Sequence, residues 1–505
     1  MLTGTSRIVV LFVVALGALV ALGPESWADR DSNNPSLVII VEGLRPEFLT
    51  RSLMPNLHAL TKRGVLFNGH HAVYPTLSGV NAASIVTGAY PQTHGLLGDT
   101  ILLPEVDAKS AFDMQEIDAL RIADDATNGG LLTTSTLGGI FGSRDMTFLV
   151  MGSGSSVTPY LLSRGFEGGA VIHPEFSQPE SLRADIIEAL GAPRDESGRT
   201  TWLVDAYLDV GLPKLTPDLA MLWLAESGLT WPDLDADDPR RVEGMRIIDV
   251  EVGRILKRHK KLRMNVNVFV TSDRGASTRV GNRDLSQFLI DEGLKADLNS
   301  RDVVVLDNGS VVVEGHDRNR IRQIVERLQR VDWVGAIYTQ QRMRTHPESF
   351  VPGALSFQAV YMAHPRTPDI LVEPAWSKDE NDHDGGTIRG FGKGEGGSSS
   401  PFDLDVVLVA AGPDIKRGVK SGVPSAHIDL APTLCFLRGI DPPATMDGRV
   451  LHEALRGGPK PESIEVLHRR HGSQADWDGG RYRIIMTESS VDGVDYLAFT
   501  KVEGL

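Results

Sequence analysis

Five short apolar runs rich in β-branched residues constrain the fold of this chain most strongly. Each is followed within a few residues by a polar or glycine-containing turn and then by a helical pattern. Their sequences are SLVIIVEGLRP (36–46), MTFLVMGSGSS (146–156), LAMLWLAESG (219–228), VNVFVTSDRG (266–275) and DVVLVAAGPD (405–414). This alternation predicts a doubly wound α/β fold, with a mostly parallel sheet and helices on both faces. In such sheets, sites lie beyond the carboxyl ends of the strands.

Three helical patterns fill the gaps between these runs. The first, MPNLHALTKRG, is expected to end with Gly64 as its C-cap, and a second is expected to run from Ser78 to Gly88. The third covers residues 240–261 and is long and amphipathic. These helices are expected to cover the sheet.

The domain organisation is expected to be a core interrupted by one insertion. Residues 29–278 and 348–460 form the two parts of the core, and 279–347 form a small inserted α+β cap with a hairpin at Asn308-Gly309. The Gly/Ser-rich stretch 379–400 is a long loop, a feature that is often functional. Residues 461–505 are expected to form a C-terminal hairpin extension.

The N-terminus has the pattern of a removed signal peptide, residues 1–28. Arg7 precedes an apolar run from Ile8 to Leu22, and Ser26-Trp27-Ala28 fits a small-x-small cleavage site. Fifteen apolar residues fall short of the roughly 20 that span a bilayer, although a signal anchor is the alternative. We therefore expect a periplasmic or extracellular protein with no membrane span in the mature chain.

Charge and cysteine content narrow the classes of partner. The formal net charge is −15, without a long basic run, which argues against nucleic-acid binding. Cys435 is the only cysteine, so no disulfide can form within the chain.

The stretch VYPTLSGVNAASIVTGAYPQTHGLLGD, residues 73–99, carries the strongest chemical pattern. Thr76 stands at or near the start of the helix expected from Ser78, where unpaired amides and the helix dipole favour an anion. A threonine in this setting is a nucleophile only when something helps to deprotonate it, for example a metal ion. The local pattern leaves open that Thr76 or Ser78 merely caps the helix.

Several stretches together resemble the nucleotide pyrophosphatase/phosphodiesterase branch of the alkaline phosphatase superfamily. They are VEGLRPEFLTRSLMPNLHALTKRGVLF, AVYPTLSGVNAASIVTGAYPQTHGLLGD, FVTSDRGAST and VLVAAGPDIKRG followed by IDLAPTLCFLRGIDPPATMDGRVLHEAL. The resemblance implies an alkaline-phosphatase-like core, an inserted cap and two zinc ions that activate a threonine nucleophile. It assigns Thr76 to the nucleophile and Asn81 to the asparagine that contacts a phosphoryl oxygen.

The metal-binding half of the family pattern is mostly absent. Asp273 matches a metal ligand, and Glu42 replaces an aspartate with a side chain one methylene longer. The other four ligand positions carry residues without ligand chemistry, Gly228, Pro232, Arg274 and Gly396. Because two zinc ions need about six ligands between them, the resemblance implies that the two-zinc site is largely lost, with Glu42 and Asp273 as vestigial or single-metal ligands.

Two acidic loops are the alternative source of ligands. Residues 233–238 contain Asp233, Asp235, Asp237 and Asp238, and residues 382–384 are Asp382, His383 and Asp384. Acidic alternation can build a calcium or magnesium site, although solvated acidic loops are commoner. We expect no cofactor, or zinc or another divalent cation if the protein is active.

The arginine in TSDRG has its own explanation. If the metals are lost, Glu42 and Asp273 are two carboxylates at neighbouring strand ends, and a cation between them reduces their electrostatic repulsion. We expect the guanidinium of Arg274 to occupy about the position that a zinc ion would take, to pair with both Asp273 and Glu42, and to be available for phosphate; a distance of more than about 6 Å from both carboxylates would contradict this pairing. The alternative is that Arg274 points into solvent.

These observations predict a catalytically impaired, exported phosphodiesterase-like protein. It retains a phosphate or anion pocket at Thr76 and Asn81 that takes a small phosphate- or sulfate-bearing ligand, or it serves as a protein partner. The main alternative is an active metal-dependent phosphodiester hydrolase with a rewired metal site and Thr76 as nucleophile. A structural relative without any ligand is the third interpretation.

Overall fold

The computed structural model describes residues 33–104, 106–166, 169–193, 195, 198–226, 229, 238–306, 308–341, 347–378, 386–391 and 397–503. The expected signal peptide and the acidic residues 233–237 and 382–384 lie outside the described residues. Of the acidic positions, only Asp238 is described. It is the N-cap of helix α10, where its carboxylate accepts from the amide of Arg240.

All five apolar runs form strands of one ten-stranded sheet, as predicted. Strand β1 (Ser36–Val41) lies between β8 (Leu219–Leu224) and β9 (Asn267–Ser272), parallel to both, and all 18 residues of these three strands are buried. Beyond β8 follow β5 (Phe148–Gly152), β6 (Ala170–Ile172) and β7 (Ser177–Gln178). On the other side, β18 (Asp405–Ala411) runs antiparallel to both β9 and β2 (Val65–His71). Strands β19 (Val419–Ser421) and β20 (Ser425–Ala426) pair with β2.

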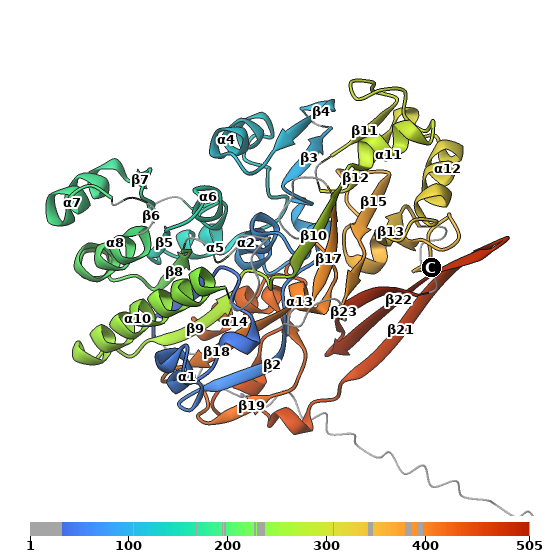
Figure 1. The fold of residues 1–505 in the computed structure, drawn as a ribbon. Coiled ribbons are helices and arrows are strands. Elements are labelled where there is room, and N and C mark those ends of the chain that lie inside the picture. Colours follow the sequence, from blue (N-terminus) through green and yellow to red (C-terminus); the bar gives the residue numbers. More distant parts are fainter. Residues whose placement is uncertain are drawn as a thin grey trace, which may run out of the picture.

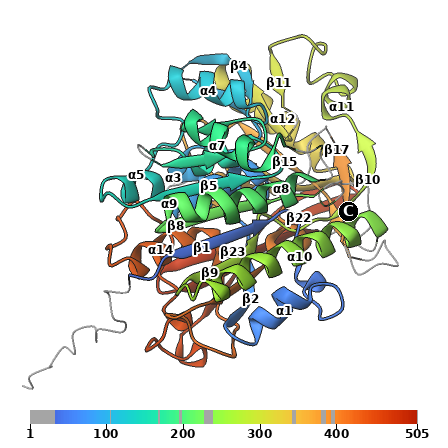
Figure 2. The same ribbon diagram turned by 90° about the vertical axis from the view of Figure 1, so that its left-hand side faces the viewer.

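Helices cover both faces of this sheet (Figure 1 and Figure 2). Alternate residues of β1 point to opposite faces: Val38 and Ile40 join one apolar cluster, while Leu37 and Ile39 join the other. The first cluster includes residues of α2 (Ser78–Thr87), α5 (Leu137–Gly142), α6 (Val157–Leu162) and α14 (Leu430–Leu437). The second includes residues of α1 (Pro55–Thr61), α7 (Glu180–Leu190), α8 (Arg199–Ala206) and α10 (Pro239–Lys261). The expected fold class is confirmed.

Two of the three expected helix boundaries are confirmed, and one is wrong. Helix α2 runs from Ser78 to Thr87, and Gly88, whose φ is 66°, is its C-cap. Helix α10 covers the long amphipathic pattern. Helix α1, however, ends at Thr61, and Gly64 is not its cap. Gly64 instead lies against β18, because a Cβ there would come within 2.0 Å of the carbonyl oxygen of Ala410.

The region after β9 adds two smaller sheets. Strands β11 (Val303–Val305), β12 (Ser310–Val313), β15 (Ile370–Pro374), β13 (Val334–Thr339) and β14 (Leu355–Ser356) form a five-stranded sheet in this order. Its strands therefore come from both sides of residue 347. This region also holds α11 (Leu285–Asp291) and α12 (Arg318–Leu328). The other sheet contains β10 (Thr278–Arg283), β17 (Thr387–Phe391) and β16 (Trp376–Ser377).

The C-terminal extension is a three-stranded antiparallel sheet. Strands β22 (Gly480–Val491) and β23 (Val494–Glu503) form the expected hairpin, and β21 (Leu467–Trp477) pairs with β22 along its length. A separate two-stranded ribbon consists of β3 (Thr100–Leu103) and β4 (Asp107–Asp113).

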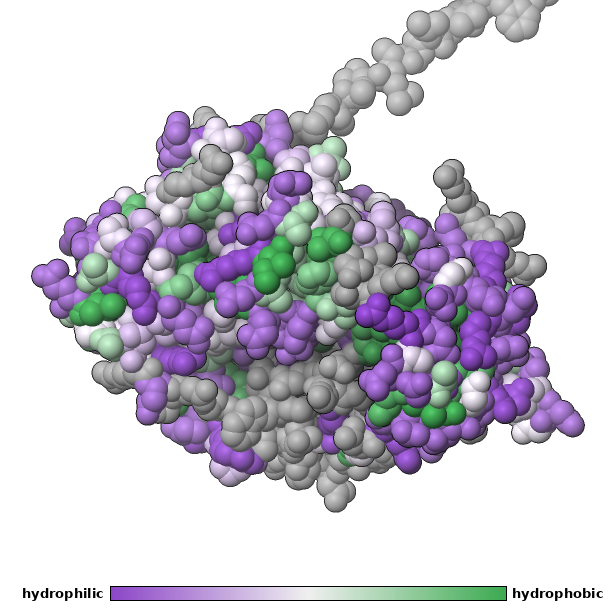
Figure 3. All heavy atoms as spheres, turned by 90° about the horizontal axis from the view of Figure 1, so that it is seen from above, coloured by the Kyte–Doolittle hydropathy of each residue, from purple (hydrophilic) through white to green (hydrophobic). Residues whose placement is uncertain are grey.

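The face of the molecule seen from above is mostly polar where its residues are described. Figure 3 shows a largely hydrophilic face on which hydrophobic areas are small and separate. Among the described helices, none combines the length and the apolar character needed to cross a membrane.

Candidate functional site

Asn81, on the first turns of α2, holds the preceding loop in place. Its Oδ1 accepts from the amide of Val73 at 2.7 Å, and its Nδ2 donates to the carbonyls of Val73 and Leu77 at 3.1 and 3.0 Å. Oδ1 also lies 2.7 Å from Nδ1 of His427, and Asn81 is fully buried. Since Oδ1 is an acceptor, the proton of this histidine is on Nδ1. An oxygen of a ligand would have to displace these bonds to reach the Asn81 amide.

Thr76 also points into the protein. It is fully buried, and its hydroxyl donates to the carbonyl of Ser398 at 2.9 Å. The hydroxyl is thus held between the loop before α2 and the loop before α13 (Pro401–Leu404). It does not line the cavity described next.

Ser78, the first residue of α2, faces a cavity of about 280 Å³. Glu42, Gly79, Asp99, Thr158 and Arg274 are among the other residues that line this cavity. No side chain caps α2, so the first-turn amides have no side-chain acceptor. The positive end of the helix dipole therefore contributes to the potential at this cavity.

The carboxylate of Asp273 anchors Ser78. Its Oδ2 accepts from the hydroxyl of Ser78 at 2.6 Å, and its Oδ1 accepts from the amides of Gly43 and Arg274 at 2.9 and 2.8 Å. Asp273 follows β9 directly and Gly43 follows β1 closely, so the parallel register of these strands brings the two turns together. Asp273 is fully buried, and each of its oxygens already has at least one donor.

Arg274 provides the positive charge of the site. Its Nε lies 3.9 Å from Oδ2 of Asp273, and its Nη1 donates to the carbonyl of Gly275 at 3.3 Å. Arg274 is 5% exposed, which excludes the alternative of a solvent-pointing side chain. The expected proximity to Asp273 is confirmed, whereas pairing with Glu42 stays a prediction. Glu42 lines the same cavity, and its Oε1 accepts from the indole of Trp223 at 2.7 Å.

A second buried carboxyl, Asp403, fixes the loop that carries Arg274. Its carboxylate accepts from the hydroxyls of Ser277, at 2.8 Å, and Ser398, and its carbonyl accepts from the amide of Gly275 at 2.8 Å. Burial raises the pKa of Asp403, while the charge of Arg274 acts in the opposite direction. A Cβ at Gly275 would come within 2.0 Å of the carbonyl oxygen of Phe402, so the close approach of the two loops requires glycine.

The described residues do not fit a two-zinc cluster. Asp273 has donors on both oxygens and the guanidinium of Arg274 beside it, which is the chemistry of an anion held by a cation and by hydrogen bonds. In the described part of the chain, no group of three or more His, Cys, Asp or Glu side chains could hold a metal ion. Gly228, Pro232 and Gly396 lie outside the described residues, and their side chains offer no metal donor.

Ser78, Asp99 and Asp403 were not identified as site residues from the sequence. Ser78 was considered only as a helix cap, yet a hydroxyl on the first helical residue is placed to face the space beyond the helix end. Asp99 and Asp403 carried no local signal, because only the folded chain brings them near Ser78 and Arg274.

Comparison with known proteins identifies the family to which this chain belongs. Residues 36–397 match the family described as type I phosphodiesterase / nucleotide pyrophosphatase. A mouse relative, bis(5'-adenosyl)-triphosphatase enpp4, is 22% identical over 421 residues, covering 82% of this chain and 79% of its own. Human ectonucleotide pyrophosphatase/phosphodiesterase family member 1 is 33% identical over 84 residues, only 16% of this chain and 9% of its own length.

Solved structures show the same fold. Murine ectonucleotide pyrophosphatase / phosphodiesterase 5 superimposes with a TM-score of 0.57 at 17% identity, over 81% of this chain and 96% of its own. The human protein of the same name gives 0.55 at 17% identity, over 81% and 95%. The chain belongs to the type I phosphodiesterase / nucleotide pyrophosphatase family, and its α/β core is alkaline-phosphatase-like.

Proposed function

We propose that this protein binds a phosphodiester in the cavity at the start of α2, and that its metal-dependent hydrolysis is lost or strongly reduced. One observation carries the proposal: the Ser78 hydroxyl, bonded to Asp273, shares this cavity with the guanidinium of Arg274. From the sequence, the pocket was expected at Thr76 and Asn81. Because both of those side chains are buried in internal hydrogen bonds, the proposal uses Ser78 in their place.

The charges around the cavity favour a monoanion. Arg274 and the first-turn amides of α2 attract a phosphoryl group, whereas the carboxylates of Glu42 and Asp99 on the same walls repel it. A phosphodiester carries one negative charge, and a phosphate monoester carries nearly two at neutral pH. We therefore expect the diester to bind more tightly than the monoester.

The same geometry explains why turnover should be weak. A serine hydroxyl needs a base or a coordinated metal to become a nucleophile. Ser78 donates to the carboxylate of Asp273, whose other oxygen already accepts from the amides of Gly43 and Arg274. In the family pattern a metal would supply this activation, but Gly228, Pro232, Arg274 and Gly396 lack the donors for it. The residues of this chain therefore bind and orient a diester without a strong activator.

Relatives suggest that the ligand contains a nucleotide. One carries the name bis(5'-adenosyl)-triphosphatase, and an inactive variant of murine ectonucleotide pyrophosphatase / phosphodiesterase 5 was solved in complex with AMP. The proposal for this chain is a diester with at least one organic substituent large enough to reach beyond the cavity of Ser78. We also propose export through the N-terminal segment 1–28, which N-terminal sequencing of the mature protein would test.

Binding and turnover are tested on the same protein. Bis(p-nitrophenyl) phosphate is titrated calorimetrically into metal-free protein, alongside p-nitrophenyl phosphate and inorganic phosphate. We expect the diester to bind most tightly, and Ser78→Ala and Arg274→Gln to weaken it at least tenfold. Thr76→Val, which removes the hydroxyl two residues away, is the matched control and should leave affinity within twofold.

Release of p-nitrophenol is then followed with and without zinc, magnesium, calcium and manganese. Metal-dependent turnover that is lost in Ser78→Ala would overturn the impaired-enzyme proposal and support the active hydrolase. Turnover lost in Thr76→Val, but not in Ser78→Ala, would return the nucleophile to Thr76. Absence of diester binding would contradict the pocket itself.

A further inference from the structure

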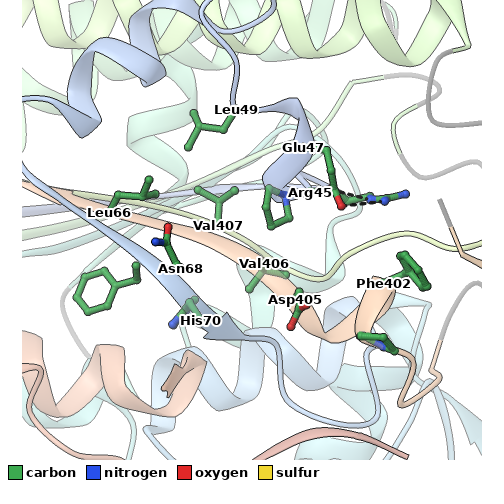
Figure 4. Close-up of a pocket in the computed structure, with 13 residues that line it drawn as sticks. Arg45, Glu47, Leu49, Leu66, Asn68, His70, Phe402, Asp405, Val406 and Val407 are labelled. Atoms are coloured by element: carbon green, nitrogen blue, oxygen red, sulfur yellow. Dashed lines mark hydrogen bonds and ion pairs between the residues drawn. The ribbon is translucent and has the colours of Figure 1, made fainter. Parts of the chain in front are cut away.

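Two surface features lie outside the proposed phosphodiester site. One is a cavity of about 320 Å³ between the short helix η1 (Pro46–Phe48) and strands β2 and β18 (Figure 4). Its charged side chains have contacts within the chain. Arg45 donates to Glu47 at 3.2 Å. Asp405 lies 3.2 Å from Nε2 of His71. The other feature is β21, the outer strand of the C-terminal sheet, where polar groups of the main chain face outward.

Strand β21 is a long and exposed edge. It covers 11 residues and pairs with β22, and no other described strand pairs with it. Figure 1 shows it on the outer side of β22, at the margin of the molecule, and no described helix or strand is drawn beyond it. A free edge presents a row of donors and acceptors that can pair with a strand of another chain.

The hairpin determines which main-chain groups of β21 face outward. Trp477 lies opposite Gly480 across a two-residue turn, and the register continues without a shift to Leu467 opposite Ser490. The pair that closes such a turn exchanges both of its hydrogen bonds, and such pairs alternate along the strand, so the odd-numbered residues of β21 bond to β22. The even-numbered residues form the outward row, whose amides and carbonyls point away from β22. They are His468, Arg470, Gly472, Gln474 and Asp476, and all are exposed.

A second copy of β21, running antiparallel, can pair with the outward row along its whole length. When a two-fold axis passes at Gly472, each residue of the row lies opposite another member of the row. Gly472 then meets Gly472, Arg470 meets Gln474, and His468 meets Asp476. Every opposed pair exchanges two main-chain hydrogen bonds. A register shifted by one residue would place outward groups opposite inward ones and lose these bonds.

The side chains select this register, while the main chain supplies the attraction. Charged residues on an edge often prevent pairing, because like charges would meet. Here His468 faces Asp476, and Arg470 faces the neutral Gln474, so the outward row opposes no like charges. Asp476 already accepts from Arg481 at 2.6 Å, but both side chains of this pair are exposed, and an exposed pair contributes little.

The ends of the strand add an apolar contact. Leu467 is 49% exposed, and in this register it lies opposite the half-buried Trp477 of the second copy. Arg469 lies opposite Ala475, so no like charges meet there either. Covering part of Leu467 removes apolar surface from water, which favours association.

We propose that this protein forms a symmetric dimer in which β21 pairs with β21 of a second copy, antiparallel and centred on Gly472. The two three-stranded sheets then become one continuous sheet, and both free edges are removed. The strand of an unrelated protein fits less well, because it would not repeat the pairing of His468 with Asp476 at both ends. Main-chain hydrogen bonds hold this dimer, as in other complexes that extend a sheet by adding a strand.

The first test removes one main-chain donor of the outward row. The molar mass of the protein is measured by analytical ultracentrifugation over a dilution series up to about 100 µM, in which the wild type should pass from monomer to dimer. Gln474→Pro removes an amide that β22 does not use, and proline is tolerated at such edge positions. It should raise the dissociation constant at least tenfold, with the melting temperature of the monomer unchanged. Gln474→Ala keeps the amide and is the matched control, which should stay within twofold of the wild type.

A pair of cysteines tests the register. The Cα atoms of a hydrogen-bonded antiparallel pair are about 5.5 Å apart, a separation that suits a disulfide. The double variant His468→Cys/Asp476→Cys should therefore form a disulfide-linked dimer under mild oxidation, whereas neither single variant should. The native Cys435 is buried and does not take part.

A wild-type chain that stays monomeric throughout the dilution series would overturn the proposal. So would a dimer that Gln474→Pro leaves unchanged, because another surface would then hold it. Equal cross-linking of the double and the single cysteine variants would contradict the register centred on Gly472. If Gln474→Pro lowered the melting temperature of the monomer, the cysteine variants would decide alone. Ser78→Ala should dimerise as the wild type does, so the dimer and the phosphodiester site are tested independently.

Discussion

The side chains around the start of α2 lie in two very different environments. At Ser78, a half-buried hydroxyl meets a cavity, a carboxylate and an arginine. By contrast, Thr76, two residues before Ser78, and Asn81, on the first turns of α2, are fully buried, and their polar groups bond to the protein itself. A single motif thus contains both the proposed binding surface and the framework that holds it. Residue type alone does not separate them, since a threonine and a serine two positions apart have opposite roles.

Substitution of Asn81 in the buried framework should cause the largest loss of stability. Asn81→Ala removes the side-chain partner of the Val73 amide, the Val73 carbonyl and Nδ1 of His427, while the carbonyl of Leu77 still accepts from the backbone amide of residue 81 at 2.9 Å. Each buried group left unsatisfied costs about 1–3 kcal/mol, and some of them will find new partners. We expect the free energy of unfolding to fall by about 3–5 kcal/mol, measured by urea denaturation. Ser78→Ala is the comparison and should lower it by no more than about 1 kcal/mol; equal losses in the two variants would erase the distinction.

Acid should act on the same framework. Burial lowers the pKa of His427 and His94 to about 3 in the folded state, so both stay neutral while the unfolded chain takes up protons below about 6.5. Their contribution to stability is present above pH 6.5 and is lost as the pH falls toward 3. We expect the urea midpoint to decrease as the pH falls over this range, and the free energy of unfolding to fall by a few kcal/mol.

Two buried carboxyl groups give the opposite pH dependence of stability, so their effect has to be distinguished from that of the histidines. Burial raises the pKa of Glu373 to about 7 and that of Asp429 to about 6. Their contribution is largest at low pH and decreases as the pH rises through these values. Glu373→Gln should therefore steepen the net acid loss between pH 4.5 and 7, whereas His427→Gln should flatten it. If the urea midpoint of His427→Gln had the same pH dependence as that of the wild type, His427 would not be a source of the acid loss.

The binding half should respond in affinity more than in stability. Arg274→Gln removes the cation that lies 3.9 Å from Asp273 while retaining a side chain that donates hydrogen bonds. We expect diester affinity to fall about tenfold to thirtyfold, equivalent to about 1.4–2 kcal/mol. The salt dependence of binding should also decrease, because a charge contact has been lost. Unchanged affinity at low salt would show that the guanidinium does not contact the ligand.

The sequence predicted the fold well because hydrophobic patterning acts locally. Each of the five apolar runs is a strand of the main sheet, and the bounds of α2 follow from the start of the helical pattern at Ser78 and from Gly88, the glycine that follows its last residue. Gly64 was misjudged because its role is long-range. It allows the carbonyl of Ala410 to approach, and no pattern within α1 reports that contact.

The site was predicted only in part for a similar reason. Asp273 and Arg274 were identified because they end a strand, where ligands of α/β sheets gather. The choice between Thr76 and Ser78, however, depends on which hydroxyl faces Asp273 and which faces Ser398, residues 195 and 322 positions along the chain. Asp403, on α13, and His427, on the short helix η6 (His427–Asp429), also come from segments that are distant in sequence. Such contacts follow from the assembled sheet and not from the spacing within one motif.

The smallest expected effect is also the most direct comparison of the two hydroxyls. Thr76→Val removes one buried hydrogen bond to Ser398 and keeps the shape of the side chain. It should cost about 1 kcal/mol in the free energy of unfolding and leave diester affinity within twofold. Ser78→Ala should do the reverse, with a large loss of affinity at nearly unchanged stability. If Thr76→Val weakened diester binding as much as Ser78→Ala, the Ser398 carbonyl bond would have to break on binding, and framework and site would be parts of one mobile unit.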